Sequence, residues 1–275
     1  MTISKFLEVH MIGAIIGDIV GSRFEFNNIK TKEFDLVGKG TSMTDDSIMT
    51  IAIDECLLEN KLDSQSVVKS LKKWGRKYPN AGYGGTFYHW IFGDREDPYW
   101  SYGNGAAMRV SGVGWFADSE DEVKSMSEAV TGVTHDHPEG LKGAETVAMC
   151  VYYARIGKDK EFIRDYIIKQ YPEVEYLDYE ELRRTYVHGE ESCQKSVPQA
   201  LYCFLISDSF EDCLRTTISI GGDCDTTAAM SCAIAEAYYK EIPENIIDAI
   251  SEYLTEDVAE VLCGCCRKLV DKTTA

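Results

Sequence analysis

Two short acidic motifs contain the residues of this chain whose types and spacing best suit chemistry. The sequence Gly-Gly-Asp-Cys-Asp-Thr at 221–226 places two carboxylates two residues apart, just before a long apolar segment. The sequence Thr-Asp-Asp-Ser at 44–47 precedes another apolar segment. Carboxylate and hydroxyl oxygens without a nearby histidine or cysteine suit Mg²⁺, Mn²⁺ or Ca²⁺ better than Zn²⁺. We therefore expect the two motifs to meet in the fold and to hold magnesium-like ions that support hydrolysis.

Helix capping is the alternative interpretation of each motif. One aspartate is enough to cap a helix, so capping leaves the second carboxylate of each motif unexplained. The helix predicted after Asp225 is apolar on nearly every side and should lie inside the protein. Unpaired carboxylates at its start would be costly without a cation or hydrogen bonds. Gly221 and Gly222 allow a tight turn that directs both carboxylates inward.

Helical periodicity predicts the elements that must position these motifs. Apolar residues recur at intervals of three and four, and convincing alternating strands are missing. Ser207-Asp208 resembles a helix N-cap, and Gly157 is expected to follow a helix that ends near Arg155. We expect an all-α chain forming a single domain over 1–275, with 1–10 as a loose N-terminal extension. The predicted helical segments are 12–22, 48–58, 144–155, 197–206, 210–218 and 226–239.

Three loops rich in glycine and aromatic residues are candidates for a binding site, namely 80–85, 99–105 and 131–140. The polar segment 171–191 is expected to be an irregular surface excursion. Gly13, Gly17 and Gly21 recur every four residues, which favours close helix packing rather than dinucleotide binding, because no strand precedes them.

The composition excludes several classes of protein. The chain has 28 basic and 46 acidic residues, giving a net charge of −18, which disfavours nucleic acid as a partner except as a modified substrate. The ten cysteines are scattered through apolar stretches and are expected to be reduced. Neither a signal peptide nor an apolar run of about 18 residues is evident, so no membrane contact and a cytoplasmic location are expected.

The chain resembles the ADP-ribosylglycohydrolase family, which includes the dinitrogenase reductase-activating glycohydrolase and the ADP-ribosyl-acceptor hydrolases. The resemblance covers nearly the whole chain, and its motifs stand in family order. They are Gly-Ala-Ile-Ile-Gly-Asp at 13–18 with Gly21 and Glu25, the motif at 44–47, Gly-Asn-Gly-Ala-Ala-Met-Arg at 103–109, Thr-His at 134–135, the segment 194–200, the motif at 221–226, and Ala-Glu-Ala-Tyr at 235–238.

The resemblance implies an orthogonal helical bundle with a central cleft that holds two Mg²⁺ or Mn²⁺ ions. The implied metal ligands are Thr44, Asp45, Asp46, Asp223, Asp225 and Thr226. The residues assigned to the catalytic centre are Glu25, Asp45, Asp46 and Asp225. The proton-transferring acid stays open among Glu25, Asp45, Asp94 and Asp97. Asp18 is expected to be buried and hydrogen-bonded near the site.

The resemblance also implies that backbone amides of Gly103, Asn104, Gly105, Ala106, Ala107 and Met108 cradle a diphosphate. His135 would contact ADP-ribose, with Tyr102 and Tyr83 as further contacts to the adenosine or the distal ribose. For Arg109, an anchor for an acidic motif is favoured over a substrate contact.

The expected reaction is hydrolysis of the glycosidic bond at ribose C1″ of an ADP-ribosylated protein or small molecule, most plausibly ADP-ribosyl-arginine protein. Alternatives are ADP-ribosyl-serine, O-acetyl-ADP-ribose, or a non-catalytic ADP-ribose-binding protein like the crystallins of the family. A different two-metal hydrolase, such as a phosphatase, is a further rival. A monomer is favoured.

Overall fold

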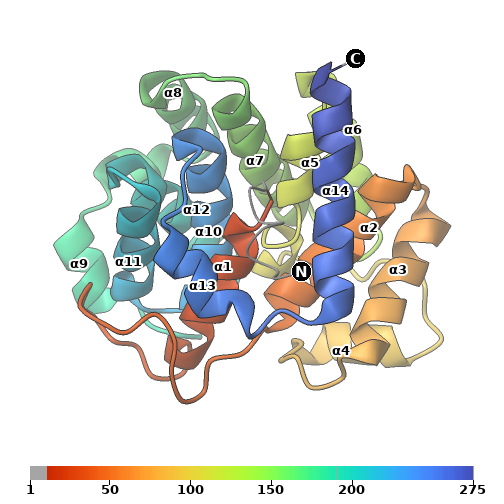
Figure 1. The fold of residues 1–275 in the computed structure, drawn as a ribbon, viewed down its shortest axis with the longest axis horizontal. Helices are drawn as coiled ribbons and strands as arrows, with labels where there is room; N and C mark the ends of the chain where they lie inside the picture. Colours follow the sequence, from red (N-terminus) through yellow and green to blue (C-terminus); the bar gives the residue numbers. More distant parts are fainter. Residues whose placement is uncertain (1–10, 190, 275) are drawn as a thin grey trace.

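The structure is a computed structural model, and it describes residues 11–189 and 191–274. The prediction of an N-terminal extension at 1–10 lies outside the described residues. The described chain is all-helical and forms one domain (Figure 1). The α-helices are α1 Gly13–Gly21, α2 Asp45–Glu59, α3 Ser64–Lys77, α4 Gly85–Phe92, α5 Ser111–Phe116, α6 Glu120–Thr131, α7 Pro138–Arg155, α8 Lys160–Gln170, α9 Tyr179–Thr185, α10 Cys193–Ile206, α11 Phe210–Ile220, α12 Cys224–Tyr239, α13 Glu244–Ser251 and α14 Glu256–Thr274.

Short 3₁₀ turns occur at Ser22–Phe24, Asn104–Ala106 and Pro172–Tyr176. Between described residues, β pairing is limited to one isolated antiparallel bridge, which joins Gly103 to Ser192. No helix in the described part is both long and apolar enough to cross a membrane.

Helices α1 and α12 form the centre of the molecule, with α2 and α3 on one side and α11 on the other (Figure 1). Every residue of α1 is buried, and so is α12 as far as Ala237. This agrees with sequences that are apolar on nearly every side. The predicted helices are all present, and the prediction of an all-α single domain is confirmed.

Glycines let α1 and α12 approach each other closely. A Cβ built on Gly13 would lie 2.5 Å from the carbonyl oxygen of Cys232, and one on Gly17 would lie 2.3 Å from the carbonyl group of Ala228. Real Cβ atoms do not tolerate such contacts with backbone. The prediction that this glycine repeat serves helix packing is confirmed.

Glu236 of α12 caps the N-terminus of α1. No side chain near Ile12 caps that helix, and instead the Glu236 carboxylate accepts hydrogen bonds from the amides of Ile12 (3.2 Å) and Gly13 (2.8 Å). A carboxylate at this position satisfies amides that would otherwise be orphaned in the core. The contact locks the two central helices in register.

Two local predictions need correction. Helix α11 is capped by Ser209, whose side chain accepts from the amide of Asp212, rather than by Ser207-Asp208. The segment 171–191 is not an irregular excursion: it contains a 3₁₀ turn and α9, and it buries Tyr171, Leu182 and Tyr186. Its few apolar residues are widely spaced, so periodicity alone did not reveal them. The end of α7 at Arg155, followed by Gly157 with φ +82°, is confirmed.

Replacing Gly17 with alanine should lower the free energy of unfolding by about 3 kcal/mol, because the added methyl group overpacks the α1–α12 contact. Gly85→Ala is the matched control, since nothing lies within 4 Å of a Cβ at that position. Urea unfolding of both variants measures the difference. Equal stability of the two variants would contradict the close approach.

Candidate active site

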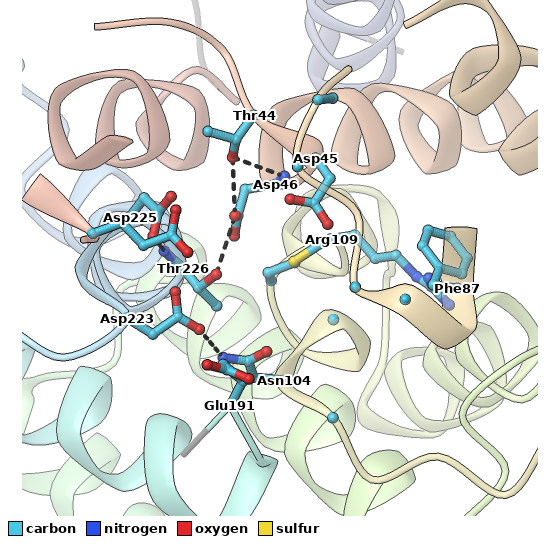
Figure 2. A pocket seen from close by; sticks show the side chains of 18 of the residues that line it. Thr44, Asp45, Asp46, Phe87, Asn104, Arg109, Glu191, Asp223, Asp225 and Thr226 are labelled. Atoms are coloured by element: carbon cyan, nitrogen blue, oxygen red, sulfur yellow. Dashed lines mark hydrogen bonds between the residues drawn. The ribbon is translucent and has the colours of Figure 1, made fainter. Parts of the chain in front are cut away.

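The two acidic motifs converge at the N-termini of α2 and α12. Thr226 donates a hydrogen bond to Asp46 Oδ2 (3.1 Å), which joins residues 180 positions apart (Figure 2). Carboxylate oxygens of Asp18, Asp46 and Asp225 lie within 4.8 Å of one another, as do those of Glu25, Asp223 and Asp225. The expected meeting of the motifs is therefore present in the fold.

Local backbone chemistry places each carboxylate. Thr44 caps α2 by accepting from the amide of Asp46 (3.3 Å), so the two aspartates occupy the first turn, where the helix dipole favours negative charge. Ahead of α12, Gly221 and Gly222 have φ of +76° and +70°, which only glycine adopts without strain. The glycine pair turns the chain so that Asp223 and Asp225 both face the other motif.

Asp18 ties the α2 motif to α1. Its two oxygens accept hydrogen bonds from the amide and hydroxyl of Thr44 (2.9 and 2.7 Å) and from the amide (3.0 Å) and hydroxyl of Ser47. The carboxylate is fully buried and has these donors for both oxygens. Asp18 therefore holds the motif in place, and the expectation of a buried, hydrogen-bonded residue is confirmed.

The clustered carboxylates have too few donors of their own. Asp46 Oδ1 is buried and has no hydrogen-bond partner. Burial, and then the charges of Asp18 and Asp223, raise the pKa of Asp45 to about 8. The pKa values of Asp46 and Asp225 are raised well above the ordinary value, again by burial first and then by neighbouring carboxylates. The all-oxygen donor set, the orphaned oxygen and the mutual repulsion fit hard divalent cations.

A cavity of 420 Å³ opens beside the acidic cluster. All three loops predicted as binding elements reach it. The lining residues are Glu25, Phe26, Thr44, Asp45, Asp46, Ala81, Gly82, Gly84, Gly85, Thr86, Phe87, Tyr99, Ser101, Gly103, Asn104, Gly105, Met108, Arg109, His135, His188, Glu191, Asp223, Asp225 and Thr226.

Asn104 links the glycine-rich loop to the acidic cluster. Its side-chain nitrogen donates to Asp223 Oδ2 (2.5 Å; Figure 2). The same nitrogen donates to Ser196 Oγ (3.0 Å). The sequence predicts a role at the site only for the backbone of Asn104. The amide side chain in fact orients one of the predicted metal ligands.

Fewer backbone amides of residues 103–108 are free to bind a diphosphate than the sequence predicts. The amides of Gly103, Asn104, Ala106, Ala107 and Met108 already donate to acceptors within the protein. For Gly105, no acceptor is present among the described residues. The side chains of Ala106 and Ala107 are fully buried and do not line the cavity. The tight 3₁₀ turn at Asn104–Ala106 consumes these donors internally.

Helix α4 supplies other donors that the sequence analysis missed. Its N-cap residue is Gly84, no side chain caps it, and its first residues Gly85, Thr86 and Phe87 line the cavity. The first amides of a helix lack intrahelical acceptors, and the helix dipole favours an anion there. The pair Gly84-Gly85, at the N-cap and first position of this short helix, was a signal for it.

His135 faces the cavity as a neutral imidazole. Its pKa is lowered well below the ordinary value, first by burial and then by the charge of Arg109. Arg109 Nη2 donates to Thr134 Oγ1 (2.7 Å), and that hydroxyl lies 2.8 Å from His135 Nδ1. Because the Thr134 hydroxyl accepts from Arg109, it can donate its own proton to His135 Nδ1. The proton of the neutral ring then lies on Nε2. His135 thus presents a hydrogen-bond donor beside Gly105.

Arg109 is completely buried, with its guanidinium 5.6 Å from the centre of the Phe87 ring. Burial lowers its pKa to about 10. Its Nη2 donates to Thr134 rather than to an acidic motif. Its side chain positions Thr134 and His135 in addition to lining the cavity.

Tyr83 and Tyr102 are not brought into the cavity. Tyr83 is buried with its ring against Phe87, at a centroid distance of 5.9 Å. Tyr102 is half exposed and packs against His137. From the same loop, Tyr99, Ser101 and Gly103 line the cavity instead.

The structure leaves fewer candidates for the acid that transfers the proton. Asp94 and Asp97 are exposed and do not line the cavity. Glu25 does line it, and its pKa is raised by burial and by the charge of Asp223. Sequence reasoning also missed Phe26, His188 and Glu191 at the cavity mouth, because they belong to segments without a recognisable motif.

Comparisons with known sequences and with a solved structure agree with one another. The sequence model of the ADP-ribosylglycohydrolase family matches residues 5–274. ADP-ribosylhydrolase ARH3 of Mus musculus is 28% identical, with 86% of this chain and 84% of that protein aligned. ADP-ribosyl-[dinitrogen reductase] glycohydrolase of Rhodospirillum rubrum is 24% identical, with 83% of each aligned. A solved ADP-ribosylglycohydrolase-related protein complex shares the fold, with a TM-score of 0.70 at 21% identity over 96% of this chain and 98% of that one.

The free energy of unfolding of the metal-free protein should fall as pH rises from about 5 to about 8. The pKa of Asp45 is raised from 3.8 to about 8 on folding. Over that interval the folded protein binds more protons than the unfolded chain, so stability present at low pH is lost as pH approaches the folded value. A hundredfold excess of Mg²⁺ over its Kd should restore about 2.7 kcal/mol at the higher pH.

Urea unfolding with a chelator and with Mg²⁺ measures both effects. Asp45→Asn should flatten the pH dependence, because it removes one of the raised carboxyl groups. Equal stability of the metal-free protein at both pH values would show that the carboxylates do not repel one another in the fold.

Proposed function

This chain belongs to the ADP-ribosylglycohydrolase family and is an enzyme of that family, and we propose that it cleaves ADP-ribose from arginine side chains of modified proteins. The scissile bond joins ribose C1″ to a guanidinium nitrogen. The observation that carries the proposal is the convergence of carboxylates from residues 44–46 and 223–226 at one end of the cavity.

We propose that two Mg²⁺ or Mn²⁺ ions bind at this cluster, held by Thr44, Asp45, Asp46, Asp223, Asp225 and Thr226. When bound, such ions orient ribose hydroxyls, lower the pKa of a water molecule and stabilise charge on the reacting groups. The orphaned Asp46 Oδ1 and the raised pKa values support this ligand set.

The remaining cavity suits the rest of ADP-ribose. The diphosphate would lie against the uncapped N-terminus of α4 and the amide of Gly105, since an acidic chain must bind phosphate through backbone donors. His135 would donate from Nε2 to an oxygen of the ligand. Tyr99 beside His135, at a ring distance of 5.8 Å, offers an aromatic surface for the adenine.

Glu25 is the side chain best placed to move the proton. As the C1″–N bond breaks, the leaving nitrogen needs a proton, and a water molecule adds to C1″. A carboxyl group whose pKa is raised by burial and by the charge of Asp223 is better able to donate the first proton and to accept one from water. Glu25, Asp223 and Asp225 lie together, so their negative charge would also stabilise an oxocarbenium-like transition state.

The cavity mouth favours a cationic acceptor. Glu191 lines the cavity with half of its side chain exposed, and Phe26 beside Glu25 is 80% exposed. A guanidinium can pair with carboxylates and stack on an aromatic ring, whereas a serine hydroxyl can do neither. The net charge of −18 would attract a basic protein in the same way.

Asp225→Ala should reduce turnover more than 100-fold, because loss of a metal ligand exceeds the effect of losing an outer-shell partner, which is about 10- to 100-fold. The helical circular dichroism signal should remain. Asp248→Ala, which removes an exposed aspartate of α13, is the control and should be fully active. Release of ADP-ribose from arginine-, serine- and nucleic-acid-linked conjugates and from O-acetyl-ADP-ribose, with Mg²⁺ present, measures activity and linkage. Near-normal turnover by Asp225→Ala would refute the metal assignment.

Glu191→Gln should lower kcat/KM for ADP-ribosyl-arginine about fivefold, the value of a half-exposed ion pair of about 1 kcal/mol, and leave serine-linked substrate unaffected. The backbone of Glu191, which accepts from the Asn104 amide, is unchanged by this substitution. Steady-state kinetics on both substrates measure the change in kcat/KM. Equal loss on both substrates, or faster release from serine, would contradict arginine as the acceptor.

A further inference from the structure

The imidazole of His188 stands between two loops at the mouth of the cavity. Its Nε2 lies 3.2 Å from Glu25 Oε1 and 3.4 Å from Glu191 Oε1. Its ring also packs against Phe26, at a centroid distance of 4.8 Å. His188 comes from the segment between α9 and α10, while Glu25 and Phe26 follow α1. The contact therefore joins segments more than 160 positions apart.

Hydrogen bonds to other parts of the protein hold both of these loops. On one side, Asn28 donates to the carbonyl groups of Glu25 (3.0 Å) and Gly222 (2.9 Å). On the other side, the Lys30 ammonium group donates to the Tyr186 carbonyl (2.5 Å), and the Glu191 carbonyl accepts from Asn104 (2.9 Å). Hydrogen bonds thus hold the backbone at Glu25 on one side of the mouth and at Tyr186 and Glu191 on the other.

The geometry favours the tautomer of His188 that has its proton on Nε2. A ring nitrogen without a proton would direct its lone pair at oxygens of Glu25 and Glu191, which is repulsive when both are ionised. We assign the proton to Nε2, which then donates to Glu25 Oε1. One Glu25 oxygen is occupied by this donor, and a carboxylate oxygen of Glu25 also lies within 4.8 Å of Asp223 and Asp225. The imidazole sets the rotation of the Glu25 carboxylate relative to the acidic cluster.

We propose that His188 is a positioning residue for Glu25: its Nε2–H holds the Glu25 carboxylate at the angle from which it transfers the proton to the leaving group. The proposal rests on the proposed function, because it assigns that proton transfer to Glu25. His188 itself touches neither ribose C1″ nor the leaving group in this role. Its effect should appear in kcat and not in the binding of ADP-ribose.

Four variants test the role. His188→Phe keeps a ring against Phe26 but removes the donor, and His188→Gln keeps a donor near the position of Nε2. Glu25→Gln removes the carboxylate. His89→Phe is the matched control, because His89 is an exposed histidine outside the cavity lining. Circular dichroism of each variant verifies the fold.

His188→Phe should lower kcat about tenfold or more, a part of the 10²- to 10⁴-fold that a positioned acid contributes, with KM and the calorimetric Kd for ADP-ribose nearly unchanged. His188→Gln should recover most of the lost kcat. In the Glu25→Gln background, His188→Phe should have no further effect. His89→Phe should match the wild-type protein. Wild-type kcat in His188→Phe, no recovery by His188→Gln, or an equal further loss in the Glu25→Gln background would overturn the proposal.

A second measurement separates this proposal from the proposed function. Urea unfolding of the wild-type protein, Glu25→Gln, His188→Phe and the double variant forms a cycle that needs no substrate. A non-zero interaction between the two sites supports the contact, and strict additivity overturns it. If the wild-type protein releases ADP-ribose from none of the conjugates while the cycle shows the interaction, the proposed function fails and the Glu25–His188 contact stands.

Discussion

Mutual repulsion among buried carboxylates is the constraint on which this structure depends. The N-termini of α2 and α12 meet at the acidic cluster, with Asp45 and Asp46 in the first turn of α2 and Asp223 and Asp225 at the N-cap and in the first turn of α12. Helix dipoles reduce the cost of placing negative charge there, but they do not remove it, as the raised pKa of Asp45 shows. The fold tolerates the cluster because the surrounding helices are held rigidly. The glycine-lined contact of α1 with α12 and the Glu236 cap provide that rigidity.

The polar residues around the cluster divide into two groups with different tasks. Asp18 and Asn104 have their hydrogen bonds completed within the protein and orient their neighbours. Asp46 retains a buried oxygen that is free for a ligand, and Asp45 lines the cavity beside it. Because the first group orients its neighbours, the second group is held in place in advance. Electrostatic catalysis requires such preorganised groups. A cation bound at this cluster would therefore raise the free energy of unfolding of the protein.

An acidic protein that binds a diphosphate must rely on dipoles instead of lysine side chains. The cavity offers the uncapped start of α4, the Gly105 amide and the Nε2–H of a neutral His135. Arg109 is too deeply buried to serve as a simple surface cation, and it acts through Thr134 on the tautomer of His135. Donors without a formal charge thus line part of the cavity beside the carboxylates, which suits an anionic group of the proposed substrate.

Much of this arrangement could be predicted from the residues alone, for physical reasons. Apolar periodicity determined the buried helices α1, α2 and α12, because a helix that is apolar all round has no solvent-facing side. Paired carboxylates with glycines ahead of them indicated a hard-cation site, because no helix cap needs two of them. The spacing of Gly13 and Gly17 predicted close packing, since the missing Cβ atoms lie on one helix face.

Only the tertiary structure decided how separate segments share the cavity. The donors of the glycine-rich loop are consumed inside its own turn, and α4 offers others in their place, which depends on the path of the backbone and not on residue type. Tyr83 and Tyr102 point away from the cavity, while His188 and Glu191 reach its mouth from a segment that has no motif. Side chains remote in sequence meet only when packing brings them together, so local patterns cannot specify those partners.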